Sequence, residues 1–179
     1  MERIKKISWK RWLLLFLCLV FASLVAGCDF KPIPAAADVD KLALRGQVEM
    51  VVEGFRKAVE EYNLEAMLAP LAEDLVLTIK EKGVAQPDKN KTVLKQELEL
   101  DEAFELGKRK QGYVMNLNFV GLVSAVADDG REATVSGRFT CNEKVSTLFL
   151  AEQGTLWFKL ALVGGAWKIQ RMILDFNGQ

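Results

Sequence analysis

Hydrophobic side chains recur at every third or fourth position after residue 41, and this spacing predicts an amphipathic helix. Its apolar positions are Leu44, Val48, Val51, Val52, Phe55, Val59 and Tyr62. Asn63 interrupts the pattern and can cap a short second helix, which Pro70 closes. A third helix is predicted from Thr92 to about Gly107, with apolar positions at Val93, Leu94, Leu98 and Phe104.

Apolar and polar residues alternate in most of the remaining chain, and this alternation predicts strands. The first strand, around residues 75–80, is followed by a polar loop at residues 83–90. The C-terminal third predicts only sheet, although residues 143–153 are ambiguous. Asp129-Gly130 and Gly164-Gly165 are two-residue hairpin signals. The order predicts an α+β fold, with N-terminal helices packed on one face of a curved antiparallel sheet.

The N-terminus has the composition of a secretory signal. Residues 1–11 are basic, and an apolar run from Trp12 to Ala26 follows them. A helix that spans a bilayer needs about 20 apolar residues, so this run is short for a permanent anchor. At its end, Leu24-Val-Ala-Gly-Cys28 resembles the lipobox of bacterial lipoproteins.

The lipobox resemblance implies cleavage between Gly27 and Cys28 and attachment of lipid to the cysteine sulfur. Two or three acyl chains hold a soluble domain stably on a membrane. We therefore expect an exported protein that is lipid-anchored to the cell membrane. Asp29 implies, by the same resemblance, the inner membrane if the organism has two. The expected parts are a signal peptide at 1–27, a lipidated cysteine and tether at 28–40, and one domain at 41–179.

Processing changes both the charge and the number of cysteines. The full chain balances 24 basic against 24 acidic residues, whereas the mature chain has 19 and 23, a net charge of −4. A mildly acidic net charge does not favour binding to the phosphates of nucleic acid, so we expect no nucleic-acid partner. Cys18 leaves with the signal and Cys28 carries lipid, so Cys141 has no partner for an intramolecular disulfide.

Two segments resemble the NTF2-like superfamily, which is also called SnoaL-like or cystatin-like. Residues 60–74 (EEYNLEAMLAPLAED) are similar to the end of its first helix and its short second helix. Residues 158–169 (FKLALVGGAWKI) are similar to its closing hairpin. The resemblance spans residues 42 to 176 and implies a cone of helices on a curved sheet. The superfamily includes isomerases, dehydratases, hydrolases, cyclases and many non-enzymes, so the fold alone assigns no activity.

The catalytic inventory is small, because the sequence contains no histidine. This removes the usual general base at neutral pH and the Ser-His-Asp and Cys-His nucleophiles. Carboxylate chemistry stays open: Tyr62 is a candidate oxyanion donor, and Arg138, Arg171 and Asp175 are candidates for a water-activating set. The helical stripe favours Tyr62 as a core aromatic with its hydroxyl at the rim, and base rates for charged residues favour a solvent-facing position for the three strand residues.

Three further features are explained by packing or solvation. The acidic residues Glu97, Glu99, Asp101, Glu102 and Glu105 precede Lys108-Arg-Lys110, as in a solvated helix with a basic C-terminus. Cys141 is in phase with Phe139, which predicts a buried, inert thiol. Trp157 and Trp167 are typical of hairpin packing residues. No pattern of metal ligands or phosphate-binding glycines appears, so we expect neither a metal nor a cofactor.

The sequence thus favours a membrane-tethered, non-enzymatic module that binds a small apolar ligand or an envelope protein. Two alternatives stay open: a carboxylate-based enzyme of the isomerase, hydrolase or cyclase type, and a structural accessory of an envelope complex. The interior of the domain separates the three. An apolar pocket favours binding, an inward carboxylate near a tyrosine or arginine favours catalysis, and a closed core favours a structural role. The sequence does not indicate an oligomeric state.

Overall fold

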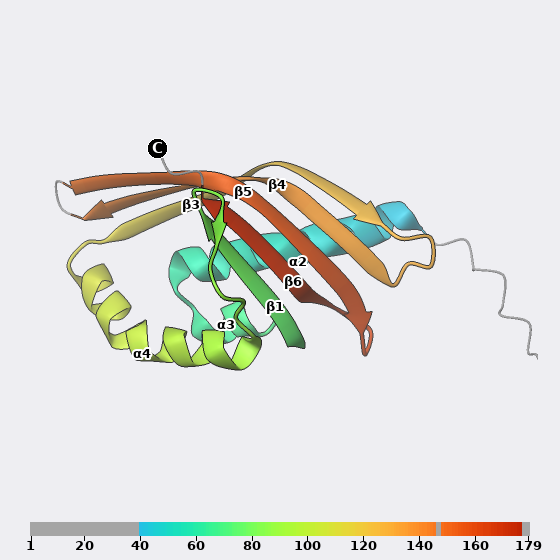
Figure 1. Ribbon diagram of the computed structural model, residues 1–179, viewed down its shortest axis with the longest axis horizontal. Helices are drawn as coiled ribbons and strands as arrows, with labels where there is room; N and C mark the ends of the chain where they lie inside the picture. The colour runs from blue at the N-terminus through green and yellow to red at the C-terminus, as the bar shows by residue number, and fades with distance from the viewer. Residues whose placement is uncertain (1–39, 146–147, 177–179) are drawn as a thin grey trace, which may run out of the picture. The chain divides into compact units, whose positions relative to one another are not determined.

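The computed structural model describes residues 40–145 and 148–176. Its helices are α2 (Lys41–Glu61), α3 (Leu64–Leu68) and α4 (Lys91–Lys110). Its strands are β1 (Leu71–Glu81), β2 (Val84–Ala85), β3 (Val114–Val126), β4 (Glu132–Val145), β5 (Leu148–Val163) and β6 (Ala166–Phe176). The helices lie on one side of a curved sheet, which confirms the predicted α+β fold (Figure 1). The predicted signal peptide, its cleavage site at Gly27 and Cys28, and most of the tether lie outside the described residues.

Each helix begins at a residue whose side chain accepts backbone hydrogen bonds. Asp40 accepts from Leu42 N and Ala43 N at the start of α2. Asn63 caps α3, as predicted, and Asn90 caps α4. The sequence therefore fixes three helix starts locally, through short polar side chains that precede apolar stripes.

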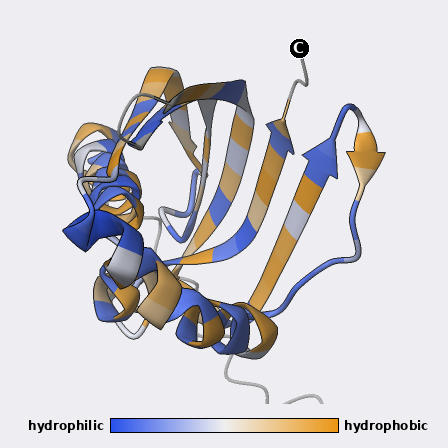
Figure 2. Ribbon diagram, turned by 90° about the vertical axis from the view of Figure 1, so that its left-hand side faces the viewer, coloured by the Kyte–Doolittle hydropathy of each residue, from blue (hydrophilic) through white to orange (hydrophobic). Residues whose placement is uncertain are grey.

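The six strands of the described residues form one sheet in the order β2-β1-β6-β5-β4-β3. Strands β3 to β6 make the predicted antiparallel meander. The sheet as a whole is mixed, because β1 pairs with β6 in parallel. Hydrophobic and hydrophilic residues alternate along the strands, as Figure 2 shows, so one face of the sheet is available to the core.

The two predicted hairpins differ in their turns. Gly164 and Gly165 have φ of 59° and 83° and join β5 to β6 directly, as predicted. The Asp129-Gly130 pair does not form a two-residue turn. It lies within a longer loop between β3 and β4, where Ala127 N donates to Glu132 O at 2.9 Å and Arg131 N donates to the Asp129 side chain. The Asp129-Gly130 signal therefore predicted the position of the chain reversal between β3 and β4 but not the length of the connecting loop.

The core lies between α2 and the concave side of the sheet. Its fully buried side chains include Val48 and Val52 from α2 and Phe158, Leu160 and Ile169 from β5 and β6. The predicted core positions Phe55 and Trp167 are also buried, at 9% and 5% exposure. The indole nitrogen of Trp167 donates to Gln47 of α2 at 3.3 Å. Helix and final strand are thus joined by packing and by one polar contact.

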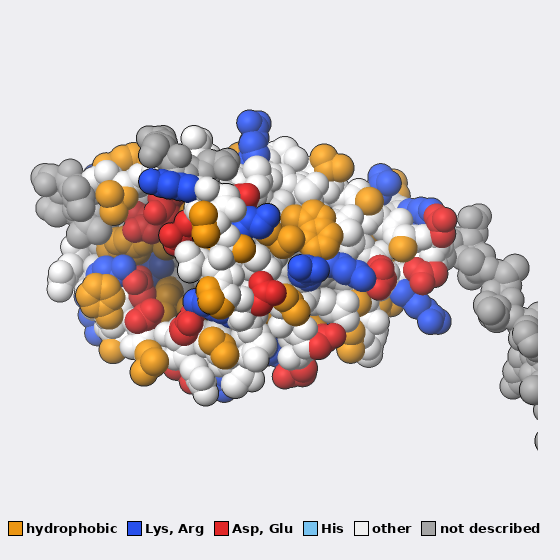
Figure 3. Space-filling model, in the orientation of Figure 1, with side chains coloured by type: hydrophobic (Ala, Val, Ile, Leu, Met, Phe, Trp, Pro, Cys, Tyr) orange, Lys and Arg blue, Asp and Glu red, His pale blue; other side chains and the backbone are white. Residues whose placement is uncertain are grey.

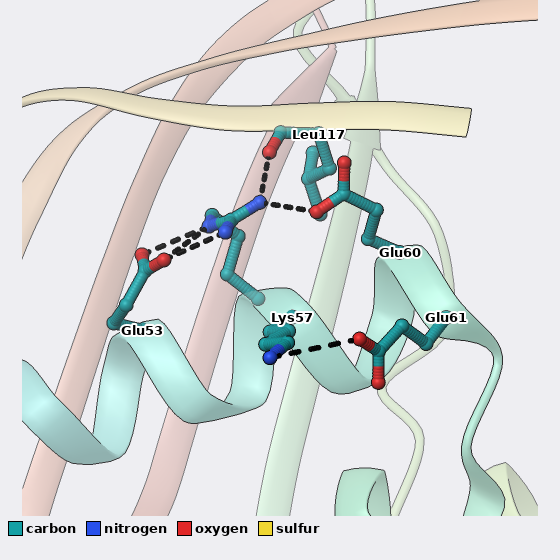
Figure 4. Close-up of polar contacts among 6 residues, drawn as sticks. Glu53, Lys57, Glu60, Glu61 and Leu117 are labelled. Carbon is teal, nitrogen blue, oxygen red and sulfur yellow. Dashed lines mark hydrogen bonds and ion pairs between the residues drawn. The ribbon is translucent and has the colours of Figure 1, made fainter. Parts of the chain in front are cut away.

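Arg56 attaches α2 to β3, which is the edge strand of the sheet. Its guanidinium donates to the backbone oxygen of Leu117 and to the carboxylates of Glu53 and Glu60 (Figure 4). The ion pairs measure 2.6 Å to Glu53 and 2.7 Å to Glu60. The arginine thus satisfies a carbonyl that an edge strand would otherwise leave open to another chain.

Helix α4 is more weakly attached than α2 and contributes no fully buried residue. Of its four predicted apolar positions, Leu94 and Leu98 are half-buried, whereas Val93 and Phe104 are 39% and 67% exposed. Its acidic residues are exposed or paired, for example Glu105 with Lys108 of the same helix at 2.5 Å and Glu97 with Lys89 of the preceding loop at 2.5 Å. This agrees with the interpretation of the charged segment as a solvated helix.

Candidate functional site

A cavity of about 240 Å³ lies between the C-terminal half of α2 and the inner face of the sheet. Strands β3, β4, β5 and β6 all contribute side chains to its wall. The lining residues are Phe55, Val59, Met115, Leu117, Phe119, Phe139, Cys141, Glu143, Glu152, Phe158, Leu174 and Phe176. All but the two glutamates carry apolar or thiol side chains, so the cavity offers a largely hydrophobic surface.

The strand register arranges the strand residues of this wall, apart from Phe158 and Leu174, in three rows. The aromatic row crosses the sheet through Phe119, Phe139, Gly154 and Phe176. The next row on the same face consists of Leu117, Cys141 and Glu152. The third contains Met115 and Glu143. Successive rows are two residues apart, or about 7 Å along a strand, so the wall changes from aromatic to acidic within about 14 Å.

Aromatic rings form the deepest part of the cavity. Phe158 is fully buried and lies edge-to-face against Phe55, with ring centroids 6.2 Å apart. It also contacts Phe119 at 6.1 Å, while Phe139 and Phe176 form a second edge-to-face pair at 5.0 Å. Such geometries are the favourable ones for aromatic pairs. The rings therefore support one another and define a rigid apolar end.

Gly154 is the one position of the aromatic row without a side chain. A Cβ there would lie 2.1 Å from the backbone oxygen of Asp175 and 2.6 Å from the Phe139 ring. The first of these contacts is with backbone, which cannot move aside cheaply. Glycine at this position thus allows β5, β6 and Phe139 to approach closely beside the cavity.

The two glutamates lie at the opposite, solvated end, which we call the acidic mouth. Glu152 is exposed and Glu143 is half-buried. Cys141 lies beside Glu152 in the middle row, between Glu143 and the aromatic row, with its Sγ 3.9 Å from the Glu143 carboxylate. Figure 3 shows a hollow beside α4, under the end of the sheet, where acidic and basic side chains lie together.

The neighbouring thiol and phenol are held in their neutral forms. Burial, assisted by the charges of Glu143 and Glu152, raises the pKa of Cys141 to about 11. Burial also raises the pKa of Tyr113, and Glu143 and Glu105 add to this effect. At neutral pH the cavity therefore presents a protonated thiol beside two carboxylates.

The basic residues nearest Tyr113 are engaged by aromatic rings or by acids. Lys108 Nζ lies 4.7 Å from the centroid of the Tyr113 ring and 2.5 Å from a carboxylate oxygen of Glu105. The Arg109 guanidinium lies between two tyrosines, 5.5 Å from Tyr113 and 5.9 Å from Tyr62. Its Nε and one terminal nitrogen are buried without a hydrogen-bond partner within the described residues. No described lysine or arginine forms an ion pair with Glu143 or Glu152.

The structure does not bring the four candidates from the sequence into this cavity. Tyr62 ends α2 with a left-handed φ of 54° and donates its hydroxyl to Leu98 O of α4 at 3.0 Å. Arg138 and Arg171 are exposed, and Asp175 is half-buried. Arg138 and Asp175 alternate with the cavity-lining residues Phe139, Leu174 and Phe176, and thus point to the other face of the sheet. Arg171 alternates with Met172, which is buried in the core.

Cys141 is buried at 8% exposure, as predicted. The glutamates of the acidic mouth were not predicted from the sequence. Extending the phase of Phe139 and Cys141 by two residues would have placed Glu143 on the inner face. Glu152 is likewise in phase with the buried Leu156 and Phe158 of β5, but it lies in the segment 143–153, whose structure the sequence left ambiguous.

Within residues 40–145 and 148–176, no group of three or more histidine, cysteine, aspartate or glutamate side chains is arranged to hold a metal ion. Among the helices of the same residues, none is long and apolar enough to cross a membrane.

The comparisons with known proteins identify the fold. No protein-family model and no curated protein sequence matches the chain. Solved structures do match: an NTF2-like protein of unknown function from Pseudomonas putida has 16% identity and a TM-score of 0.57, over 75% of this chain and 87% of that one. The domain therefore has the NTF2-like fold.

Structural neighbours with named activities are equally distant in sequence. The beta subunit of benzoate 1,2-dioxygenase from Burkholderia mallei has 13% identity and a TM-score of 0.65, over 73% of this chain and 89% of that subunit. A ketosteroid isomerase-like protein from Erwinia carotovora atroseptica has 14% identity and a TM-score of 0.53, over 75% and 97%. The fold is thus shared by enzyme-like proteins and by a dioxygenase subunit. An argument about function must therefore rest on the residues of the cavity.

Proposed function

We propose that this protein is an exported lipoprotein, anchored through lipid on Cys28, whose NTF2-like domain binds a small apolar ligand. The basic and apolar N-terminal segments and the Leu24–Cys28 motif support the anchoring part. The observation that carries the binding part is the cavity, which is apolar for most of its surface and lined from both α2 and the sheet. A closed core would have favoured a purely structural role.

The volume of the cavity limits the size of the ligand. An engineered cavity of about 150 Å³ with apolar walls accommodates benzene. The cavity of about 240 Å³ is larger by roughly the volume of a short side chain on such a ring. We therefore propose a ligand with one aromatic or branched apolar group and a few further atoms.

A carboxylate-based enzyme is the second candidate, because Glu143 and Glu152 both line the cavity. Proton abstraction by a glutamate also needs a hydrogen-bond donor for the oxyanion that develops on the substrate. The described lining residues supply a thiol as their only side-chain donor. Glu143 interacts with the phenol of Tyr113, which is the arrangement that would favour catalysis, but Tyr113 is not among the residues that line the cavity. The same geometry therefore favours binding over catalysis.

A matched pair of variants on β6 tests the binding proposal. Leu174 lines the cavity, whereas its neighbour Ile173 is half-buried on the opposite face. Leu174→Phe should fill part of the cavity and weaken binding of an apolar probe such as n-butylbenzene at least tenfold. Ile173→Phe should leave binding unchanged. The affinities can be measured by equilibrium dialysis of the full chain in lipid nanodiscs against empty nanodiscs.

The outcome of this test is unambiguous if folding is verified by circular dichroism. If the folded wild-type protein takes up no more n-butylbenzene than empty nanodiscs do, the binding proposal fails. If both phenylalanine variants lose binding equally, the ligand does not occupy this cavity.

The anchoring proposal has its own test. Cys28→Ala removes both the lipid acceptor and the cleavage position, so the chain should stay uncut and should not incorporate a labelled fatty acid in cells. The wild-type chain should incorporate the label and sediment with membranes. Absence of label from the wild type would show that the Leu24–Cys28 motif is not used.

A further inference from the structure

The cavity is lined by two carboxylates and one thiol as its polar groups. Glu143 and Glu152 are hydrogen-bond acceptors with negative charge, and the Cys141 thiol is directed toward Glu143. The remaining lining residues have no polar side-chain atom other than the Met115 sulfur, which is a weak acceptor. A ligand that fills the cavity must therefore bring the hydrogen-bond donor or the positive charge itself.

The protein does not neutralise these two carboxylates through the described ion pairs. Other glutamates nearby are paired: Glu60 with Arg56 at 2.7 Å and Glu105 with Lys108 at 2.5 Å. Glu143 and Glu152 form no such pair with a described side chain. Two carboxylates at the rim of an apolar surface repel one another and attract a cation, because the low-polarity wall strengthens their field.

We propose that the ligand class is an apolar molecule with one positively charged nitrogen, such as an arylalkylamine. This deepens the proposed binding function and rests on it. The apolar part lies among the rings of the aromatic row, and the ammonium group lies between Glu143 and Glu152. The Glu152 row is two residues from the aromatic row, or about 7 Å. A chain of two or three carbons between ring and nitrogen spans this distance.

The charge pattern also excludes ligand classes. A fatty acid or another apolar anion would place its carboxylate beside two like charges, which disfavours binding. A neutral alcohol of the same size gains the apolar contacts but not the ionic ones. The inferred order of affinity is therefore ammonium, then alcohol, then carboxylate.

Three probes of nearly equal size test this order: 2-phenylethylamine, 2-phenylethanol and phenylacetate. Their affinities for the full chain in lipid nanodiscs are measured at pH 7 and low salt by equilibrium dialysis against empty nanodiscs. We expect the amine to bind at least tenfold more tightly than the alcohol, and phenylacetate to bind most weakly. Raising the ionic strength should reduce the preference for the amine.

Variants assign the preference to the acidic mouth. In Glu143→Gln/Glu152→Gln the amine and the alcohol should bind within about twofold of each other, because the amides keep the shape and remove the charge. The control Glu99→Gln removes a charge from the exposed side of α4 and should retain the tenfold preference. Circular dichroism verifies that all three proteins are folded.

The possible failures are distinguishable. If the alcohol binds as tightly as the amine, or phenylacetate binds best, the inference about charge is wrong while the cavity-binding function stands. If the double variant keeps the preference, the ammonium is not recognised by Glu143 and Glu152. If the folded wild type binds none of the probes, nor n-butylbenzene, the proposed binding function itself is wrong and this inference falls with it.

Discussion

The contact between Phe55 of α2 and Phe158 of β5 makes the strongest quantitative prediction about the fold. The rings lie edge-to-face at 6.2 Å with an interplanar angle of 75°. Replacing either phenylalanine with leucine removes about three buried carbons, at ~0.8 kcal/mol each, or roughly 2 kcal/mol. Loss of aromatic geometry adds ~0.5–1.5 kcal/mol per pair. We expect Phe55→Leu to cost ~2.5–3.5 kcal/mol and Phe158→Leu ~3–5 kcal/mol, because Phe158 also contacts Phe119.

A double-mutant cycle isolates the contact itself. The double variant should be less destabilised than the sum of the single variants by ~0.5–1.5 kcal/mol, since the pair is lost only once. Leucine is preferred to alanine because a domain with ~5–15 kcal/mol of total stability must stay folded in the double variant. Urea unfolding of a chain that begins at Asp38 gives the free energies, and Glu99→Ala, at an exposed site, should change them by less than ~0.5 kcal/mol. A coupling energy near zero, or single variants as stable as the control, would refute the packing of α2 on this part of the sheet.

Three further predictions concern the surroundings of the cavity. Gly154→Ala should destabilise the domain by at least ~2 kcal/mol in urea unfolding, because its Cβ would overlap the backbone oxygen of Asp175. Unchanged stability would contradict the close approach of β5 and β6. The pKa of Cys141 is raised to about 11 in the folded state, from an ordinary value near 9. The contribution of this thiol to stability is therefore complete below pH 9 and is lost as the pH rises to 11. A comparison of wild type and Cys141→Ala between pH 8 and 11 should show a smaller fall for the variant, and parallel curves would contradict the shift. Arg56→Met keeps the aliphatic stem but leaves the carbonyl of Leu117 without its donor. We therefore expect the free energy of unfolding to fall by ~1–3 kcal/mol and amide hydrogen exchange along β3 to become faster. Exchange at the wild-type rate would contradict the role of Arg56.

Local patterns predicted the elements of the domain well, because the physical signals are local. The apolar stripe from Leu44 to Tyr62 and the polar caps needed no knowledge of distant residues. The glycine pair at 164–165 specified its turn because both positions require positive φ. By contrast, the parallel pairing of β1 with β6 joins residues about a hundred positions apart, and no pattern in either segment encodes its partner.

The earlier candidates on the strands show a different limit. Arg138 and Asp175 were candidates because of their charged side chains, yet strand alternation already places Arg138 on the face opposite to Phe139 and Cys141. The same argument separates Asp175 from Leu174 and Phe176. Applied strictly, the period of two assigns these charged residues to the outer face, where the structure places them. Position in the strand alternation therefore predicted the orientation of these residues better than the chemistry of their side chains.

The acidic mouth forms only when β4 and β5 pair in the correct register. Glu152 faces the cavity because Cys141 pairs with it across the β4–β5 hairpin, and a slip of one residue would turn it outward. An unpaired carboxylate is costly to bury, by several kcal/mol even after relaxation. Two of them on the inner face therefore oppose closure of the core over this end. The aromatic row supplies the apolar contacts, and the glutamates keep its open side hydrated. An accessible cavity is thus a consequence of which residues face inward, and a mobile gate is not required to explain it.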